Sequence, residues 1–225
     1  IRTAGAGTNE DEARAPAVID AAGGRRIVVL SFGLASAGVP AEWAATPSRS
    51  GVWFLPELDA RAVVAVAARV SAVRRAGDVV VASIHWGSNW GYLVPSSHRT
   101  FARWLVDRAG VDVVHGHSSH HPRGIEIYRD RPILYGCGDL LNDYEGIGGY
   151  EAFRPELGVM VFATLSAGGT LVDLTLVPTR IAHLRVNRAR GDDVAWLAAT
   201  LDRESREFGA RVERRPDDTL GVGLR

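Results

Sequence analysis

The sequence contains few residues that can cross-link or anchor the chain. Its single cysteine, Cys137, excludes an internal disulfide framework, and every basic residue is arginine, because lysine is absent. The formal net charge at pH 7 is zero, which gives no indication of a nucleic-acid partner or of an anionic membrane surface. No apolar run is long enough to span a bilayer, and no signal peptide is recognisable. Composition therefore leaves the cellular compartment open.

Methionine is also scarce: the chain starts with Ile1, and its only methionine is Met160. We therefore expect a processed chain or a part of a longer polypeptide. Its 225 residues are enough for one domain with a sizeable core. Apolar and charged fractions of 46% and 23% are ordinary for a globular protein.

Apolar runs rich in β-branched residues alternate with segments of helical periodicity, which predicts an α/β fold. We expect strands at 18–20, 27–32, 79–84, 111–114, 124–128, 132–135, 157–165 and 170–181, and helices near 10–15 and at 59–76, 96–109 and 193–208. Ser96 or Ser97 is the expected cap of the third helix, and Asp192 or Asp193 that of the last. The stretch 78–126 is the central strand–helix–strand unit.

Five of the seven histidines follow two of these apolar runs. His85 follows the run 79–84, and His115, His117, His120 and His121 follow the run 111–114. The carboxyl ends of such strands meet at one edge of an α/β sheet, and a turn can aim two imidazoles at one point. Because neutral imidazole binds Zn, Mn or Fe, the pattern predicts a metal site at His85, His117 and His120. The alternative is that these are ordinary surface histidines.

The same letters, GHSSH at 116–120, resemble the G-x-S-x-G nucleophile elbow, which would make Ser118 the nucleophile of a serine hydrolase. That elbow requires a helix directly after the serine. Gly124 and the β-branched residues after it do not favour a helix, and the last glycine of the elbow is missing. The serine hydrolase is therefore kept only as a second alternative.

A glycine-rich loop follows the strand expected to end at Tyr135. It carries Asp139, Asn142 and Asp143, and a carboxylate there can bridge metals or hold a histidine ligand in orientation. A solvated loop is the alternative. Cys137, between two glycines, is expected to be a buried small side chain.

Two larger side chains beside the histidines are candidates for substrate contact. Arg123 can meet an anionic substrate, although a surface position is the ordinary one for arginine. Trp86 can wall a pocket beside His85, although core packing is an equally good interpretation.

Three sequence blocks carry a family signature. They are SIHWG at 83–87 with Trp90 and Pro95 behind it, VVHGHSSH at 113–120 with Glu126, and YGCGD at 135–139 with Asn142 and Asp143. The opening residues 5–16 and the closing helix with Phe208-Gly209 fit the same pattern. Together they resemble the poly-γ-glutamate capsule-synthesis (CapA/PgsA-like) family, a branch of the calcineurin-like metallophosphoesterase superfamily.

The resemblance implies an α/β, metallophosphoesterase-like β-sandwich flanked by helices (αββα), of which this chain is mainly the C-terminal half. Residues 1–181 would form this N-terminally incomplete domain, and the helix and tail at 182–225 would pack on it. His85 and His117 would bind one metal and His120 the other, with Asp139 in the catalytic group. The family's first half supplies further ligands and precedes this chain, so the three histidines alone leave each metal short of ligands.

The sequence departs from the family where Asn89 replaces Glu, Ser119 replaces Pro and Asp139 replaces Asn. Asn89 joins Trp86 and Arg123 as an expected substrate-binding residue. These departures leave the substrate open.

We therefore expect a metal-dependent hydrolase with two divalent transition-metal ions (Mn, Zn or Fe), acting on a phosphoester or on poly-γ-glutamate or another cell-envelope polymer. A non-catalytic binding or assembly module for capsule polymer synthesis or export is the first alternative. The expected partners are an anionic small molecule or polymer and an N-terminal half or partner chain that completes the metal site, but no nucleic acid. The family implies the bacterial cell envelope or extracellular face; a cytoplasmic location and the oligomeric state stay open.

Overall fold

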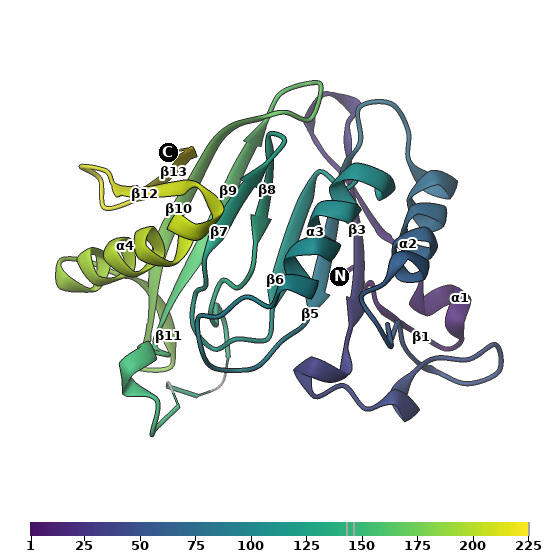
Figure 1. Cartoon of the computed structure of the whole chain (residues 1–225), viewed down its shortest axis with the longest axis horizontal. Coiled ribbons are helices and arrows are strands. Elements are labelled where there is room, and N and C mark those ends of the chain that lie inside the picture. The colour runs from purple at the N-terminus through teal and green to yellow at the C-terminus, as the bar shows by residue number, and fades with distance from the viewer. Residues whose placement is uncertain (143, 146, 225) are drawn as a thin grey trace. The chain divides into compact units, whose positions relative to one another are not determined.

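The structure is a computed structural model that describes residues 1–142, 144–145 and 147–224 (Figure 1). The chain forms two compact units. The first unit comprises Ile1–Gly87, Val94–Gly116 and Ala167–Gly169, and the second comprises Ser88–Leu93, His117–Ser166 and Thr170–Arg225. Both contain strands and helices, so the expected α/β class is confirmed. Over the described residues, no helix is both long and apolar enough to cross a bilayer.

The first unit is built on a mixed sheet in the order β2-β3-β5-β6. These strands are β2 (Ala17–Asp20), β3 (Arg26–Gly33), β5 (Val79–His85) and β6 (Val113–His117), and β1 (Ala6–Gly7) pairs separately with β4 (Gly51–Val52). β2 and β3 form an antiparallel hairpin, and β3 runs parallel to β5. The helices are α1 (Glu10–Ala13), α2 (Ala60–Val73) and α3 (Ser96–Ala109), with short 3-10 turns at Ala22–Gly24, Ala35–Ala37 and Ala41–Trp43.

Alternate residues of β5 are fully buried, since Val80, Ala82 and Ile84 are 0% exposed while the residues between them are half-buried. The strand therefore has one well-covered face, whereas the uniformly apolar run suggested two. On α3, Phe101 and Leu105 are likewise buried, as the helical spacing predicts. Phe101 meets Phe32 of β3 edge-on, with ring centroids 6.3 Å apart.

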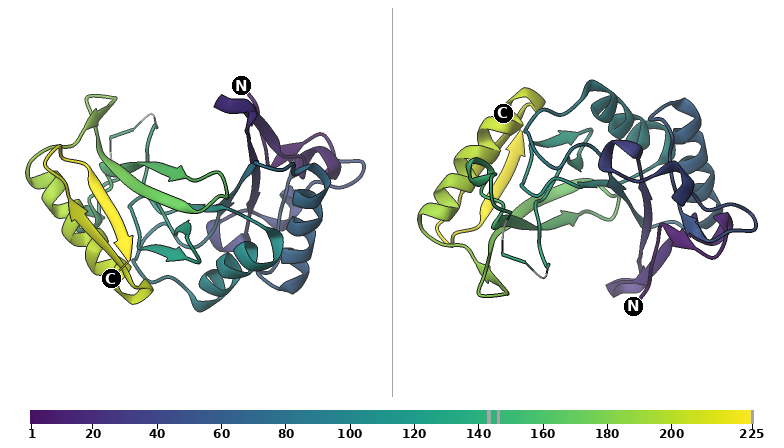
Figure 2. Two further views of the ribbon diagram at one scale, coloured as in Figure 1. Left: turned by 90° about the horizontal axis from the view of Figure 1, so that it is seen from above. Right: turned by 90° about the horizontal axis from the view of Figure 1, so that it is seen from below.

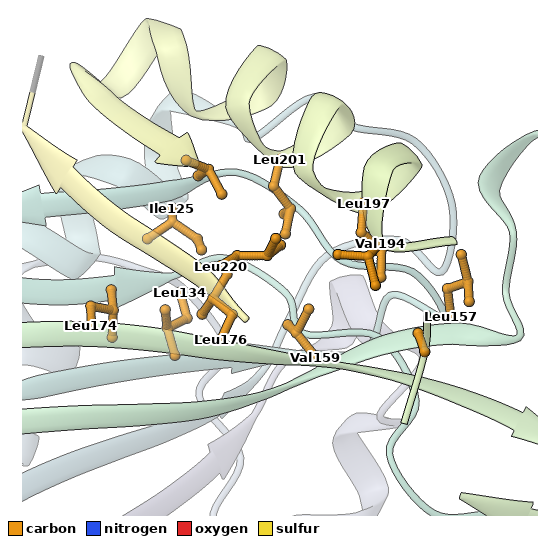
Figure 3. Packing of buried hydrophobic residues seen from close by; sticks show 12 residues of the cluster. Ile125, Leu134, Leu157, Val159, Leu174, Leu176, Val194, Leu197, Leu201 and Leu220 are labelled. Atoms are coloured by element: carbon orange, nitrogen blue, oxygen red, sulfur yellow. The ribbon is translucent and has the colours of Figure 1, made fainter. Parts of the chain in front are cut away.

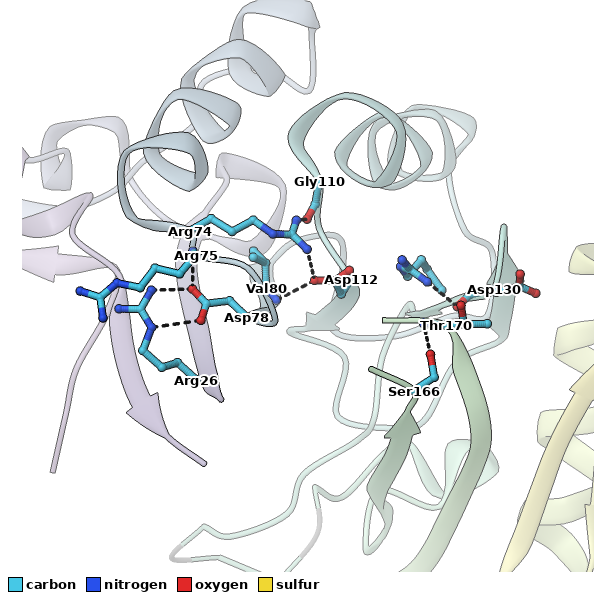
Figure 4. A network of polar contacts seen from close by, with 11 residues as sticks. Arg26, Arg74, Arg75, Asp78, Val80, Gly110, Asp112, Asp130, Ser166 and Thr170 are labelled. Carbon is cyan, nitrogen blue, oxygen red and sulfur yellow. Dashed lines mark hydrogen bonds and ion pairs between the residues drawn. The ribbon is translucent and has the colours of Figure 1, made fainter. Parts of the chain in front are cut away.

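Two buried carboxylates hold the amino-terminal ends of β5 and β6 (Figure 4). Asp78 accepts from Arg26 Nε at 3.0 Å, from Arg26 Nη2 at 2.5 Å and from the Arg75 backbone N–H at 2.7 Å. The Arg26 guanidinium thereby lowers the pKa of the Asp78 carboxyl. Asp112 accepts from Arg74 Nη2 at 3.0 Å and from the Val80 backbone N–H at 2.9 Å.

The boundaries or caps of three helices differ from expectation. α2 is capped by Asp59, whose carboxylate accepts from the Ala62 N–H, but it ends at Val73 rather than at residue 76. α3 begins at Ser96 itself, with Pro95 in the capping position, so neither Ser96 nor Ser97 is its cap. α4 (Asp192–Ser205) follows Gly191 as its cap, and the two aspartates expected there lie in its first turn.

The second unit contains an antiparallel hairpin of β7 (Ile125–Tyr128) and β8 (Arg131–Leu134). Its larger sheet has the order β11-β10-β13-β12, with β9 also paired to β10. These strands are β9 (Leu157–Leu165), β10 (Leu171–Ala182), β11 (Arg185–Arg188), β12 (Ala210–Arg214) and β13 (Leu220–Leu224), with 3-10 turns at Glu151–Phe153 and Arg206–Phe208. Residues 182–225 share this unit with residues 117–166, and α4 lies against β12 (Figure 2).

The core of the second unit lies between α4 and its strands (Figure 3). Leu197 and Leu201 of α4 are 0% exposed, as are Leu174 and Leu176 of β10. Their helical and alternating spacings put these side chains on one face of each element. Burial of a leucine side chain contributes about 1.5–3 kcal/mol to the free energy of unfolding.

We predict that Leu201→Ala lowers the free energy of unfolding by about 2–5 kcal/mol, because it leaves a cavity in this core. Urea unfolding followed by circular dichroism measures the change. Leu93→Ala is the matched control, since Leu93 is 81% exposed and should change stability by less than about 0.5 kcal/mol. Equal losses in both variants would contradict the assignment of this core.

Candidate functional site

The histidine loop of the second unit leaves β6 through a strained residue. Ser118 has φ +127°, a region that non-glycine residues rarely adopt, and Ser119 Oγ donates to the His121 carbonyl at 2.8 Å. Residues 119–124 run on to β7 without a helix, and the structure describes all of them. The strand–turn–helix context of a nucleophile elbow is therefore missing at Ser118.

His120 pairs with Asp139. Its Nδ1 lies 3.1 Å from Asp139 Oδ1 and 3.0 Å from Oδ2, and its backbone N–H donates to the Asn89 carbonyl at 3.1 Å. A bare Nδ1 would face two carboxylate lone pairs, so the proton belongs on Nδ1 and the lone pair on Nε2. A carboxylate that orients a histidine in this way is typical of metal sites.

The Asp139 carboxylate has two further donors in its own loop. Tyr144 Oη donates to Oδ2 at 2.9 Å, and Asn142 Nδ2 donates to the same oxygen at 3.1 Å. Tyr144 Oη is also 3.3 Å from His120 Nδ1. Asp143, expected in this group, lies outside the described residues. The structure therefore places the Asp139 carboxylate where it can orient His120.

An aromatic cluster lies beside this pair. Trp90 stacks on Tyr150 with ring centroids 3.9 Å apart, and its ring is 5.5 Å from that of His120. His121 packs between Phe153 at 4.7 Å and Tyr92 at 4.8 Å.

His121 is a buried, neutral histidine. Its Nδ1 donates to the Pro122 carbonyl at 3.0 Å, which leaves the lone pair on Nε2, and that nitrogen is buried without a partner among the described residues. Burial lowers the pKa of His121 to about 4, since the charged imidazolium would lose its hydration. His121 therefore does not face solvent.

Arg123 is 2% exposed, which contradicts the ordinary surface position. Its Nη2 donates to the Ser88 carbonyl at 2.7 Å and to Ser88 Oγ at 3.1 Å. No carboxylate pairs with it anywhere in the described chain, and its Nε is buried without an acceptor there. Burial lowers the pKa of Arg123, but an arginine remains charged at neutral pH. The second unit thus encloses a cation whose acceptors are neutral oxygens.

In the first unit, His85 ends β5 and lines a pocket of about 270 Å³ together with Phe32, Val39 and Trp43. Trp86 is 1% exposed and stacks on His98, with ring centroids 4.6 Å apart. The structure thus favours core packing for Trp86. His115 Nδ1 lies 3.2 Å from Ser83 Oγ, and burial lowers the pKa of His115.

A metal site needs several ligands at one point. His120 offers an oriented Nε2 lone pair, which fits one ligand of such a site. Within the described residues, however, no three His, Cys, Asp or Glu side chains are grouped to hold an ion. His85 belongs to the first unit, whereas His117 and His120 belong to the second. The described residues therefore fit part of a metal site.

Sequence reasoning missed Tyr144 and the aromatic cluster around Trp90. Tyr144 lies five residues after Asp139, on an irregular loop where no periodicity fixes the direction of a side chain. The only available signal was its position after Asp139 and Asn142. Tyr150 and Phe153 reach Trp90 across about sixty residues of chain, a contact that only tertiary structure makes.

The profile of the family described as bacterial capsule synthesis protein PGA_cap matches residues 1–144. The chain belongs to this family. It is 49% identical over 224 residues to a probable polyglutamine synthesis accessory protein of Mycobacterium tuberculosis. The matched stretch covers 99% of this chain and 59% of that relative. The chain thus spans somewhat more than half the length of that relative.

Two Bacillus proteins match over shorter stretches. The PGA biosynthesis protein CapA of Bacillus subtilis is 32% identical over 74 residues, which is 33% of this chain and 19% of that protein. The capsule biosynthesis protein CapA of Bacillus anthracis is 30% identical over 66 residues, 29% of this chain and 16% of that protein. The expected family resemblance is confirmed.

We predict that stability falls between pH 6.5 and pH 4. His121 has a folded pKa of about 4 against an ordinary value of 6.5, so the unfolded chain binds its proton first as pH falls. The loss is on the order of 3 kcal/mol at pH 4. Urea midpoints across this range measure it. His121→Phe retains an aromatic ring and should reduce the slope; an unchanged slope would contradict the assignment.

We also predict an inert thiol. Cys137 is half-buried, and desolvation raises the pKa of its thiol from 9.0 to about 12, which reduces its thiolate fraction about a thousandfold. The folded chain should therefore react at least about a hundredfold more slowly with Ellman's reagent than the same chain in guanidinium chloride. Similar rates in the two conditions would show that the sulfur is accessible.

Proposed function

We propose that this chain is part of a metal-dependent hydrolase of the capsule synthesis family, acting on a phosphoester or on a poly-γ-glutamate or other cell-envelope polymer. The supporting observation is the His120–Asp139 pair, which leaves the Nε2 lone pair of His120 available as a ligand. In this proposal His85, His117 and His120 hold two divalent transition-metal ions, with further ligands from outside this chain. Such ions polarise a phosphoryl or carbonyl oxygen and lower the pKa of bound water.

The chain's own residues have three tasks in this proposal. Asp139 fixes the His120 imidazole, the rings of Trp90, Tyr92 and Phe153 limit access of water, and Arg123 contributes positive charge. Because the acceptors of Arg123 are neutral oxygens, its field favours an anionic substrate. Through Ser88 it also holds the segment that carries Asn89, whose carbonyl accepts from the His120 N–H. Asn89 is exposed and can contact substrate.

The second candidate is a non-catalytic binding or assembly module for capsule polymer synthesis or export. Two findings favour it. The described residues contain no group of three metal ligands, and the 49% identical relative is named an accessory protein. In this candidate the same His120 loop and Arg123 bind polymer without cleaving it.

The test uses the full-length protein that contains this chain. Elemental analysis measures its metal content. Hydrolysis of bis(p-nitrophenyl) phosphate and of p-nitrophenyl phosphate is measured with added Mn²⁺. We predict that His120→Ala lowers bound metal and reduces hydrolysis at least about a hundredfold, because it removes a ligand. His183→Ala is the matched control, since His183 is exposed in a turn. Polymer binding without metal or hydrolysis would support the second candidate instead.

A further inference from the structure

We propose that Tyr144 is a positioning residue, which fixes the tautomer and ring orientation of His120 through the Asp139 carboxylate. This inference rests on the proposed function, because it concerns how a ligand of the same site is held. No sequence pattern points to Tyr144, and the proposal comes from its hydrogen bonds in the second unit.

Three donors converge on one carboxylate. Oδ2 of Asp139 accepts from Tyr144 Oη at 2.9 Å and from Asn142 Nδ2 at 3.1 Å, and it lies 3.0 Å from His120 Nδ1. Oδ1 lies 3.1 Å from the same Nδ1. The Asp139 and His120 side chains are 19% and 23% exposed, whereas Tyr144 itself is exposed.

The contribution of Tyr144 follows from the softness of the carboxylate torsion. The terminal torsion of an aspartate is broad, so a carboxylate held only by His120 can rotate away from Nδ1. Tyr144 and Asn142 fix Oδ2 from the other side, which keeps both oxygens directed at Nδ1. The proton then stays on Nδ1 and the lone pair on Nε2.

Tyr144 also opposes a flip of the imidazole ring. Its Oη lies 3.3 Å from Nδ1, and its ring meets the imidazole edge-on with centroids 6.5 Å apart. A flipped ring would turn a C–H group toward the hydroxyl and the carboxylate, and three hydrogen-bonding groups would lose a partner. The hydroxyl is therefore the part of Tyr144 that acts, rather than the ring.

The test compares Tyr144→Phe with Tyr150→Phe on the metal-free, ¹⁵N-labelled chain at one neutral pH. Tyr150 is the matched control, because it lies on the same loop and contacts the site through its ring, stacked on Trp90. Long-range ¹H–¹⁵N spectra report the tautomer of His120, whose signals are assigned by their loss in His120→Ala. Asp139→Asn shows how far the tautomer populations of His120 shift when the carboxylate is lost completely.

In the wild-type chain and in Tyr150→Phe we expect the Nδ1–H tautomer. In Tyr144→Phe we expect about a fivefold rise in the Nε2–H population, the change that one ordinary hydrogen bond produces. Tautomer populations identical in Tyr144→Phe and wild type would overturn the proposal. Thermal unfolding checks that each variant is folded. If Tyr144→Phe does not fold, Asn142→Ala removes the other donor to the same carboxylate oxygen. An unchanged His120 tautomer in Asn142→Ala would then overturn the proposal that these donors position the carboxylate.

A second readout separates this proposal from the proposed function. In the full-length protein, Tyr144→Phe should weaken Mn²⁺ binding about tenfold and Tyr150→Phe should not. A tautomer shift in a protein that binds no metal would support the positioning role and refute the metal-dependent function. If Tyr144→Phe has the same metal affinity and the same His120 tautomer as the wild type, only the positioning role of Tyr144 is refuted.

Discussion

The close approach of backbone at Gly136 and Gly138 is the constraint on which the site in the second unit depends. A Cβ at Gly136 would lie 2.4 Å from Ser119 Oγ, and one at Gly138 would lie 3.0 Å from Pro122 Cδ. Gly138 also has φ +74°. These glycines extend the pairing of the β7–β8 hairpin, since the Arg123 N–H donates to the Gly136 carbonyl at 2.9 Å. Asp139 therefore meets His120, although nineteen residues of chain separate them.

Electrostatics gives the neighbouring groups different tasks. Asp139 is surrounded by donors, so it can act as a fixed acceptor for one imidazole. His121, which follows His120 in the chain, is kept neutral by burial among aromatic rings. Arg123 keeps a buried positive charge with neutral acceptors, which costs hydration free energy and is retained where a charge has a use. The oriented His120 and the buried Arg123 are the two features on which the proposed function rests.

Sequence periodicity predicted the regular elements well wherever a buried face imposed it. The strands near 27–32, 79–84 and 157–165 and all the long helices are present, because apolar spacing records which face packs. β11 was missed, since the turn before it places His183 and Leu184 at φ +56° and +54° without glycine or asparagine. β12 was missed because it is only five residues long and three of its residues are charged.

For the site, the sequence by itself determined which residue types follow the strand ends, and hence the candidates His85, His117, His120 and Asp139. It also determined the family, because short motifs with fixed spacing can be recognised without knowledge of the fold. Only the tertiary structure decided that Trp86 and Arg123 are buried, that Asp139 pairs with His120, and that Tyr144 completes this group. Spacing along a chain fixes directions in helices and strands, whereas the directions of loop side chains depend on contacts with residues far away in the sequence.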